Sequence, residues 1–356
     1  MNAVPSPPPA SSFAPPASAS SLSPRDRLDR PLRDLRLSVI DACNFRCPYC
    51  MPADRVPDDH GLDSASRLSF DQIERVVRGF ARVGVRKLRL TGGEPLLRKG
   101  LPELIARLAA IDGIEDLALT TNGSLLAPQA CALREAGLHR LTVSMDALTP
   151  SVFSALSGGR GRVEDVLRGL DAARDAGFDN IKLNCVIQRG ANEDECLPLS
   201  EFARTRGHTL RFIEYMDVGT CNGWRADRVV PSAELRDRIH ARWPLRPLDP
   251  NYRGEVARRY RYEDGGGEVG FVGSITEPFC GDCHRARVSA DGRLYTCLFA
   301  AEGADLRPWL AQGDEAFAQR LDDAWRARAD RYSELRAARE ASPGTRKRVE
   351  MFLVGG

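Results

Sequence analysis

The sequence lacks the long apolar run that a membrane-spanning helix needs: no stretch of about 18 apolar residues occurs in the 356 residues. It also lacks an excess of charge of one sign, since 51 basic and 49 acidic residues leave a net charge of +2. We therefore expect no membrane partner, and no nucleic-acid partner bound through a general positive field. An anionic ligand would need a local cluster of Arg and Lys instead.

Charged side chains are missing altogether from residues 1–24, which are rich in Pro, Ser and Ala. This segment lacks the basic start and apolar block of a secretory signal, and it lacks the arginines of a transit peptide. We interpret it as a disordered extension. Without such a signal the cysteines are expected in a reducing compartment, so we expect a cytoplasmic protein.

Cysteine is not scarce, but its placement is uneven. Six of the ten cysteines form two groups, which we call the first triad (Cys43, Cys47 and Cys50) and the second triad (Cys280, Cys283 and Cys297). The other four lie in periodic segments, where a free cysteine is usually a small buried residue. We predict that these four pack in the core: Cys131, Cys185, Cys196 and Cys221.

From about residue 35 the sequence alternates strand patterns with amphipathic helical patterns. Strands are predicted at 35–41, 86–91, 115–121, 139–145, 180–187 and 209–215. Helices are predicted near 69–83, 100–110, 128–136, 161–176 and 193–206. Six βα units of this kind predict a parallel sheet covered by helices.

The strand patterns favour a barrel over an open sheet. In four of these strands one face is apolar and the other polar, as with Leu88 and Leu90 against Arg89. Strands of an open parallel sheet are usually apolar on both faces. A recurring polar face predicts a wet interior, so we expect an α/β fold with an incomplete (β/α)6 TIM-like barrel over residues 25–220.

After about residue 220 the alternation stops. Strands are predicted at 255–263, 267–274, 285–290 and 293–297, and helices near 314–327 and 331–340. We expect residues 221–356 to form a smaller C-terminal α+β region that carries the second triad and closes the barrel.

The first triad follows the first strand, with three residues between its first two cysteines and two between its last two. Three thiolates so close together can hold three irons of a [4Fe–4S] cube and leave one iron open. S-adenosylmethionine can chelate an open iron through its amino and carboxylate groups, and these cofactors then supply radical chemistry. A zinc site without its fourth ligand is the alternative.

The second triad is again three-membered, and a second cube with an open iron is the preferred interpretation. A zinc knuckle with His284 as the fourth ligand is the alternative. Because His284 is adjacent to Cys283, its side chain is expected to point away from that site.

The first triad, with Tyr49 before its last cysteine, and the segment Thr91-Gly92-Gly93-Glu94-Pro95 resemble the motifs of the radical S-adenosylmethionine superfamily. The resemblance narrows to the GTP 3′,8-cyclase family of molybdenum cofactor biosynthesis, and it runs from about Leu35 to Gly356. It rests on Cys-Pro-Tyr-Cys-Met-Pro (47–52), Thr-Gly-Gly-Glu-Pro-Leu-Leu-Arg (91–98), Thr-Thr-Asn-Gly (120–123), Ser-Met-Asp (144–146), Arg-Phe-Ile-Glu-Tyr-Met (211–216) and the terminal Gly-Gly.

This resemblance implies a lyase that converts GTP to (8S)-3′,8-cyclo-7,8-dihydroguanosine 5′-triphosphate with two [4Fe–4S] clusters and S-adenosylmethionine. The implied contacts of S-adenosylmethionine are Tyr49, Gly93, Ser144 and Met216. The implied contacts of GTP are Arg36, Arg89, Thr120, Lys182, Arg285, Ala286 and Arg287. Strand alternation independently predicts Arg36, Arg89 and Lys182 on polar strand faces.

The resemblance further implies an electron donor such as flavodoxin or ferredoxin, a homodimer, and hand-over of the product to cyclic pyranopterin monophosphate synthase. It implies that guanine binds the open iron of the second cluster. Two alternatives stay open at this point. A two-cluster radical enzyme that modifies a peptide would usually carry more C-terminal cysteines, and a redox sensor would not need a polar barrel interior.

The chain ends in an apolar run, Met351-Phe-Leu-Val, followed by two glycines. Four apolar residues at a free end are not expected to stay solvated, so we predict that this tail docks. Gly355 and Gly356 could then thread a narrow channel in which a side chain would clash. The resemblance also implies that they reach toward the active site.

Overall fold

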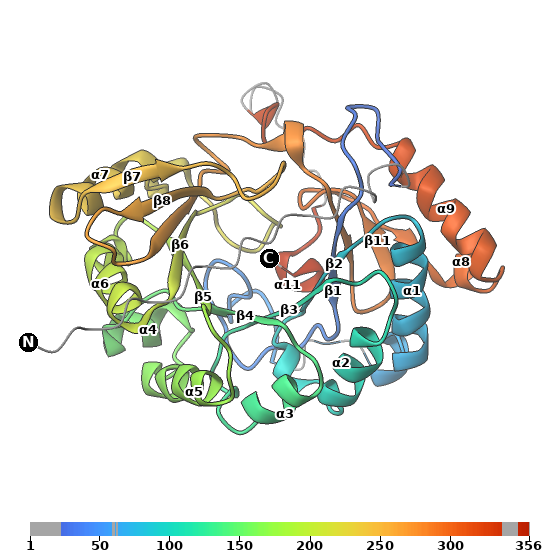
Figure 1. Ribbon diagram of the computed structural model, residues 1–356, viewed down its shortest axis with the longest axis horizontal. Coiled ribbons are helices and arrows are strands. Elements are labelled where there is room, and N and C mark those ends of the chain that lie inside the picture. The colour runs from blue at the N-terminus through green and yellow to red at the C-terminus, as the bar shows by residue number, and fades with distance from the viewer. Residues whose placement is uncertain (1–22, 59–60, 62, 337–347, 356) are drawn as a thin grey trace, which may run out of the picture.

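A computed structural model describes residues 23–58, 61, 63–336 and 348–355. Within this part of the chain one sheet curves around a central space, and helices cover its outer side (Figure 1). The short helix α11 (Met351–Val354) lies inside the curve, next to β1. The expected N-terminal extension falls outside the described residues, except for Ser23 and Pro24.

All six predicted βα strands are present, which confirms the predicted fold class. They are β1 (Asp34–Ser38), β2 (Lys87–Thr91), β3 (Asp116–Thr121), β4 (Arg140–Ser144), β5 (Lys182–Ile187) and β6 (Thr209–Glu214). Each strand pairs in parallel with the next one in chain order. The apolar side chains of β1, such as Leu35 and Leu37, are buried in the core, whereas Arg36 faces the interior of the barrel.

The C-terminal region adds one parallel strand to each edge of this six-stranded sheet. Strand β10 (Arg285–Val288) pairs with β1, and β9 (Glu268–Val272) pairs with β6. Four antiparallel strands lie beyond them: β11 (Arg293–Tyr295), β12 (Ala304–Asp305), β8 (Arg258–Tyr262) and β7 (Leu245–Leu248). The sheet is therefore continuous across the predicted boundary between residues 220 and 221, and that boundary stays a prediction.

The helices on the outer side form where amphipathic patterns predict them. They are α1 (Phe70–Arg82), α2 (Leu101–Ala109), α3 (Ala130–Glu135), α5 (Val163–Asp175), α6 (Cys196–Arg206) and α9 (Asp314–Arg326). Helix α1 begins with a capping box, in which Ser69 and Gln72 each accept a hydrogen bond from the other's backbone N–H. Its buried residues, including Ile73, Val77 and Phe80, follow the helical period.

Several short elements were not predicted from the sequence. They are α4 (Pro150–Leu156), α7 (Ser232–Arg242), α8 (Arg307–Leu310), β7 and β12. Helix α7 buries only Ser232, Leu235 and Ile239, so its apolar pattern is weak. The prediction of a helix near 331–340 falls partly on residues 337–340, which lie outside the described residues.

The topology places the two triads at opposite ends of the parallel strands. The first triad follows the carboxyl end of β1. Cys280 and Cys283 precede β10, which runs parallel to β1, and Cys297 follows β11, which runs antiparallel to β10. Because β1 has five residues, at about 3.3 Å each, the two ends are on the order of 15 Å apart.

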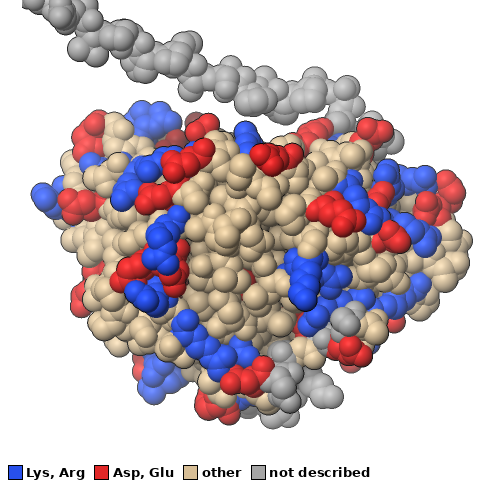
Figure 2. All heavy atoms as spheres, turned by 90° about the horizontal axis from the view of Figure 1, so that it is seen from below, with Lys and Arg blue, Asp and Glu red and all other residues tan. Residues whose placement is uncertain are grey.

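The outer surface carries charges of both signs. Figure 2 shows Lys and Arg interspersed with Asp and Glu on one face, and neither sign covers that face. This distribution agrees with the net charge of +2 and gives no broad positive field. No helix in the described residues is long and apolar enough to cross a membrane.

Candidate active site

The first triad lies on a turn that Cys47, one of its three members, closes through its backbone carbonyl. The carbonyl of Cys47 accepts hydrogen bonds from the N–H groups of Cys50 (3.0 Å) and Met51 (2.8 Å). The N–H of Phe45 points at the sulfur of Cys43, 3.4 Å away. Backbone N–H groups that face cysteine sulfurs are a common feature of iron–sulfur sites, where they adjust the cluster's potential.

The glycine motif after β2 is packed directly against the loop of the first triad. The N–H of Gly93 donates to the carbonyl of Ile40, and that of Glu94 donates to the carbonyl of Ala42. A Cβ on Gly93 would lie 2.3 Å from the oxygen of Ala42. The two loops can approach so closely only because Gly93 has no side chain.

Two buried carboxylates fasten the neighbouring strand ends to this region. Glu94 accepts hydrogen bonds from Thr121 Oγ1 (2.7 Å) and the N–H of Asn122 (2.8 Å), and burial raises its pKa to about 7. Asp146, after β4, accepts a 2.7 Å hydrogen bond from the hydroxyl of Tyr49, and burial raises its pKa to about 6. Tyr49 is thereby held against the carboxyl end of β4, where Ser144 also lies.

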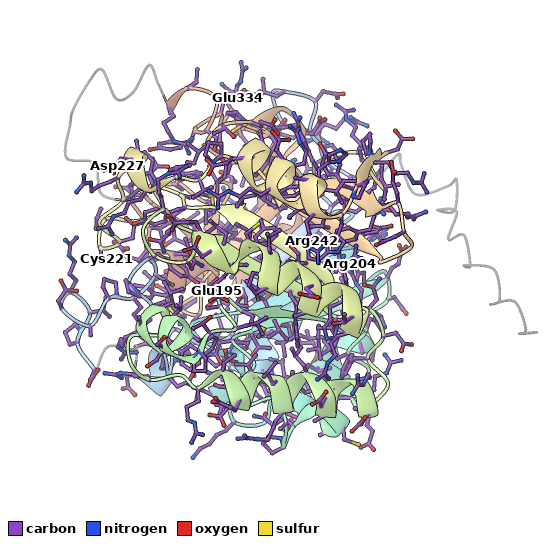
Figure 3. All side chains as sticks on the ribbon, turned by 90° about the vertical axis from the view of Figure 1, so that its left-hand side faces the viewer. Glu195, Arg204, Cys221, Asp227, Arg242 and Glu334 are labelled. Atoms are coloured by element: carbon purple, nitrogen blue, oxygen red, sulfur yellow. The ribbon has the colours of Figure 1, made fainter. Side chains whose placement is uncertain are left out.

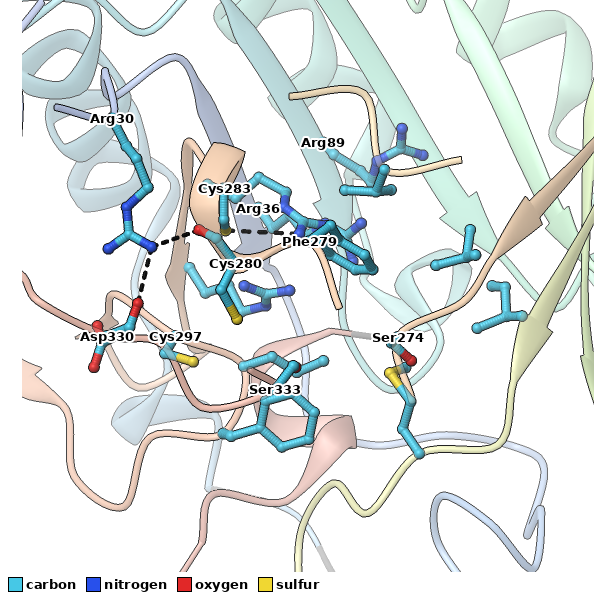
Figure 4. A pocket seen from close by; sticks show the side chains of 18 of the residues that line it. Arg30, Arg36, Arg89, Ser274, Phe279, Cys280, Cys283, Cys297, Asp330 and Ser333 are labelled. Atoms are coloured by element: carbon cyan, nitrogen blue, oxygen red, sulfur yellow. Dashed lines mark hydrogen bonds between the residues drawn. The ribbon is translucent and has the colours of Figure 1, made fainter. Parts of the chain in front are cut away.

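The second triad lies in a strongly basic environment (Figure 4). The guanidinium of Arg285 donates to the sulfur of Cys283 at 3.6 Å. Burial raises the pKa of the Cys283 thiol, but Arg285 and Arg328 outweigh burial and lower it to about 5. By contrast, burial and the carboxylate of Glu94 raise the pKa of Cys43 to about 11. The neighbouring arginines therefore favour the thiolate form of Cys283, which is the form that binds metal.

Both triads fit cubes better than single metal ions. In the described residues, no three His, Cys, Asp or Glu side chains converge as one ion requires. The cysteines of a cube bind different irons, so they need not converge on one point. His284 does not complete a zinc knuckle, because among the described residues it does not converge with the cysteines of the second triad on one point; its ring packs near Tyr252.

The barrel interior carries two layers of charge that differ in balance. In one layer the strand register puts Arg285, Asp34, Lys87 and Asp116 side by side on β10, β1, β2 and β3. The signs alternate there, and Lys87 lies 3.8 Å from Asp116. The next layer puts Arg287, Arg36 and Arg89 side by side, and we call these three residues the arginine row.

The arginine row has no carboxylate of its own. Across the described part of the chain, none of its three members forms an ion pair, and Arg89 donates instead to Thr120 and Thr142. Burial and then Arg287 lower the pKa of Arg36, and burial and then Arg285 lower that of Arg287 to about 10. Three cations in one row, with Arg287 buried and Arg36 and Arg89 half-buried, are unfavourable unless an anion joins them.

One cavity connects the arginine row to the second triad and to the carboxyl end of β6. Its lining includes all three cysteines of the second triad, the arginine row, Thr120 and Met216, which follows the carboxyl end of β6. Among the described atoms, Nε of Arg285 and Nε of Arg287 are buried without a hydrogen-bond partner. Unpaired buried donors of this kind are costly and point to a ligand with acceptor oxygens.

The structure gathers most of the predicted GTP contacts, with two differences. Arg36, Arg89, Thr120, Arg285 and Arg287 line the cavity. Ala286 alternates to the opposite face and is fully buried in the core, so only its backbone is available to a ligand. Lys182 lines a neighbouring cavity, which shares Arg211 with the first.

Arg211 and Asn184 line the main cavity but were not assigned from the sequence. Arg211 lies on β6, inside a predicted strand, and its position in the period-two pattern matches that of Lys182 on β5. The period-two alternation of side chains along the strand could therefore have identified Arg211 from the sequence. Arg30 and Arg328 also line the cavity, and they lie outside every predicted barrel strand.

The cysteines outside the triads divide into two kinds. Cys185 and Cys196 are buried in the core, as predicted. Cys131 is exposed, so the prediction that it packs in the core is wrong; it lies on the solvent side of α3. Cys221, labelled in Figure 3, is half-buried rather than in the core. Its thiol donates to Glu350 at 2.9 Å, and its sulfur lies 3.6 Å from the carbonyl oxygen of Cys50.

The C-terminal tail docks beside the same loops. Glu350 accepts hydrogen bonds from the N–H and hydroxyl of Thr220, and Phe352 is buried in a cluster with Met51 and Val56. A Cβ on Gly355 would lie 2.0 Å from the side chain of Thr91, at the carboxyl end of β2. Only glycine therefore fits at position 355 of the tail. Gly356 lies outside the described residues.

Comparison with known proteins agrees with this geometry. The chain matches the family model of the radical SAM superfamily over residues 37–203 and that of Molybdenum Cofactor Synthesis C over residues 208–334. A crystal structure of Streptococcus suis SuiB bound to S-adenosylmethionine has a TM-score of 0.59 at 14% identity, over 86% of this chain and 68% of that one. This likeness shows the fold alone. The fold and the first triad thus define a radical SAM protein.

Relatives with higher sequence identity identify the family within the radical SAM class. A GTP 3′,8-cyclase of Xanthomonas campestris pv. campestris (strain B100) is 68% identical over 332 residues, which is 93% of this chain and 97% of that protein. A GTP 3′,8-cyclase of Staphylococcus aureus (strain MRSA252) is 43% identical over 336 residues, 93% and 98% of the two chains. The chain belongs to the GTP 3′,8-cyclase family, lyases of molybdenum cofactor biosynthesis that use S-adenosylmethionine and [4Fe–4S] clusters.

The assignment of the triads predicts the iron content. Anaerobically reconstituted protein should hold about eight irons per chain, because each cube contributes four. Replacing Cys280, Cys283 and Cys297 with Ala should halve the iron and preserve reductive cleavage of S-adenosylmethionine. The control is Cys185→Ala, a buried cysteine outside both triads, which should keep all the iron. Stoichiometric zinc with only four irons would contradict the second cube.

Proposed function

We propose that GTP binds in the cavity that the second triad lines, with its triphosphate on the arginine row, and is cyclised there to (8S)-3′,8-cyclo-7,8-dihydroguanosine 5′-triphosphate. One observation carries this proposal: the buried Arg287 and the half-buried Arg36 and Arg89 stand side by side without a carboxylate, in a cavity that the second triad lines. Guanidinium groups bind phosphate in bidentate fashion, so a triphosphate would supply the missing negative charge.

The residues present suit the cofactors of the family. The first triad would hold one cube and the second triad the other, with guanine at the open iron of the second. Tyr49, Gly93, Ser144 and Met216 would contact S-adenosylmethionine. When bound, the first cube and S-adenosylmethionine supply a carbon-centred radical that removes the 3′ hydrogen of the ribose.

The protein's own contribution is to position the nucleotide and exclude water. Arg89 is already oriented, since it donates to Thr120 at 3.1 Å and to Thr142 at 2.9 Å. The unpaired Nε atoms of Arg285 and Arg287 are donors that need no reorganisation to meet phosphate oxygens. Fixing both ends of the substrate brings the ribose and C8 of guanine into one reactive geometry. The docked tail limits access of water at the first triad.

The proposal includes partners that reductive chemistry and the family support. A one-electron donor such as flavodoxin or ferredoxin would reduce the first cube. A homodimer, a cytoplasmic location and hand-over of the product to cyclic pyranopterin monophosphate synthase complete it. The hand-over follows because the synthase would consume the cyclised nucleotide.

The arginine row is tested by removing its members singly. Arg36→Ala, Arg89→Ala and Arg287→Ala should each weaken GTP binding by about 1.5–3 kcal/mol, the range for hydrogen bonds to charged groups. Calorimetric titration of the reconstituted protein measures this loss. Arg107→Ala is the control, since Arg107 pairs with Asp71 and Glu74 outside the barrel. Wild-type affinity in all three variants would refute the proposed phosphate site.

The lowered pKa of Lys182 predicts that the protein takes up protons when GTP binds. Burial, then Arg211 and Arg140, lower its pKa to about 6, so it is neutral at pH 8 in the free protein. A nearby phosphate favours the charged form and raises this pKa, so GTP binding at pH 8 should take up protons. Calorimetry in two buffers of different ionisation enthalpy measures the uptake. Lys182→Met should abolish it, and Lys99→Met, at an exposed lysine, should not. Equal uptake in wild type and Lys182→Met would contradict this assignment.

The activity and the tail are tested in one reaction. Anaerobic protein with S-adenosylmethionine, dithionite and GTP should form the cyclised nucleotide. Deleting Gly355 and Gly356 should leave cluster content and GTP binding nearly intact, abolish cyclisation and leave uncoupled cleavage of S-adenosylmethionine.

A point variant makes the same test of the tail sharper. Gly355→Ala should act like the deletion, because its Cβ would meet Thr91. The matched control is Gly313→Ala: Gly313 also has a positive φ (94°), but no neighbouring atom lies within 4 Å of its added Cβ. A truncated enzyme that cyclises GTP at the wild-type rate would show that the tail is only a chain end. Absence of product from wild type would instead refute the activity.

A further inference from the structure

Two buried arginines lie behind the second triad, and no role follows for them from the sequence or from the relatives. Arg30 comes from the segment before β1, and Arg328 follows α9. The side chain of each is only 1% exposed. Both line the cavity of the second triad. Burying two guanidinium groups is unfavourable unless hydrogen bonds and opposite charges compensate them.

Each arginine donates to the backbone of a cysteine of the second triad. Arg30 Nη1 donates to the carbonyl of Cys280 at 2.6 Å, and Arg328 Nη1 donates to the carbonyl of Cys283 at 2.6 Å. Figure 4 shows Arg30 between Cys280 and Asp330, whose carbonyl it also contacts at 2.8 Å. The two arginines thus fix the loop that carries two of the three thiols.

One carboxylate lies between the two arginines. Asp26, with a side chain that is 0% exposed, is 2.6 Å from Arg30 Nε and 3.3 Å from Arg328 Nη1. A second carboxylate, Asp330, has its Oδ2 3.5 Å from Arg328 Nε, and its side chain is 37% exposed. Nη2 of Arg30 and Nε of Arg328 are buried without a hydrogen-bond partner among the described atoms. Among the described residues, the cavity lining around the second triad holds Arg30, Arg285, Arg287 and Arg328 but only one carboxylate, Asp330, so positive charge is in excess there.

The surroundings of the first triad have the opposite character. Buried Glu94 and Asp146 lie beside it, and Glu350 approaches through Cys221. Arg46, between Cys43 and Cys47, donates to the carbonyl of Cys43 and is 3.5 Å from Asp58. Acidic side chains therefore lie beside the first triad and basic ones beside the second, at opposite ends of the parallel strands.

We propose that Arg30 and Arg328 are positioning residues of the second cluster, which hold its loop and raise its reduction potential above that of the first cluster. The proposal rests on the second triad binding a cube, as proposed above. Accepting one electron adds negative charge to the cube. Nearby cations stabilise that charge, and they do so strongly because the site is buried. Hydrogen bonds from the second shell also hold the ligand loop in place.

The test isolates the second cluster in the full chain. A background variant in which Cys43, Cys47 and Cys50 are replaced with Ala should bind about four irons. An anaerobic redox titration followed by electron paramagnetic resonance then reports one cluster. Arg30→Met and Arg328→Met should each lower the ratio of reduced to oxidised cluster about tenfold at a given potential, a shift of about 59 mV for one electron.

Variants with the opposite charge effect separate electrostatics from structural damage. Asp26→Asn removes the shared negative charge and should shift the potential upward. Arg30→Lys and Arg328→Lys keep the charge and should recover most of the loss. Arg107→Met, on the far surface of α2, should leave the potential unchanged.

The outcomes distinguish this proposal from the one it rests on. Fewer than four irons in the background variant would refute the second cube itself. Four irons with unchanged potentials in both Arg→Met variants would overturn the role of the arginines. A shift in the same direction for Asp26→Asn and Arg→Met would also overturn it, because charge would then not be the cause. If the Met variants lose the cluster, the Lys and Asn variants still decide the sign.

Discussion

The arrangement of this molecule depends on a layer of positive charge that the fold leaves uncompensated. In one layer of the barrel interior Arg285, Asp34, Lys87 and Asp116 alternate in sign, so that layer needs no ligand. One step along the strands, Arg287, Arg36 and Arg89 stand together without a carboxylate. The C-terminal region creates this row, since β10 brings Arg287 beside Arg36. Under the proposed function, an anion would complete an interior whose charge the chain leaves unbalanced.

The other end of the site depends on backbone contact rather than charge. Gly93 packs against Ala42, and Gly355 packs against Thr91, in both cases closer than a side chain would allow. Three chain segments far apart in sequence thus meet at the carboxyl ends of β1 and β2. This close packing holds Tyr49 and the first triad in one place, with Tyr49 bonded to Asp146 at the end of β4.

Local patterns were sufficient to predict much of the fold and part of the site. Period-two alternation predicted six strands and put Arg36 and Arg89 inside, because neighbours along a strand decide which face a side chain takes. The same rule, applied to Ala286, would have excluded its side chain. Arg30 and Arg328 could not be found in this way: Arg30 contacts the carbonyl of Cys280 across 250 positions, a distance no local pattern encodes. Helix α7 escaped prediction because it buries few residues.

One buried carboxylate ties the two ends of the site together. Asp217, next to Met216, accepts hydrogen bonds from Arg348 of the tail (3.2 Å), Arg336 (3.1 Å) and the hydroxyl of Tyr332 (2.7 Å). The ring of Tyr332 stacks on Phe299 at 4.3 Å, and Phe299 lines the cavity near Cys297. The tail, the loop after β6 and the flank of the second triad therefore share one anchor. Because removing a buried partner of such a network leaves other charges unpaired, these three segments are held in one relative arrangement.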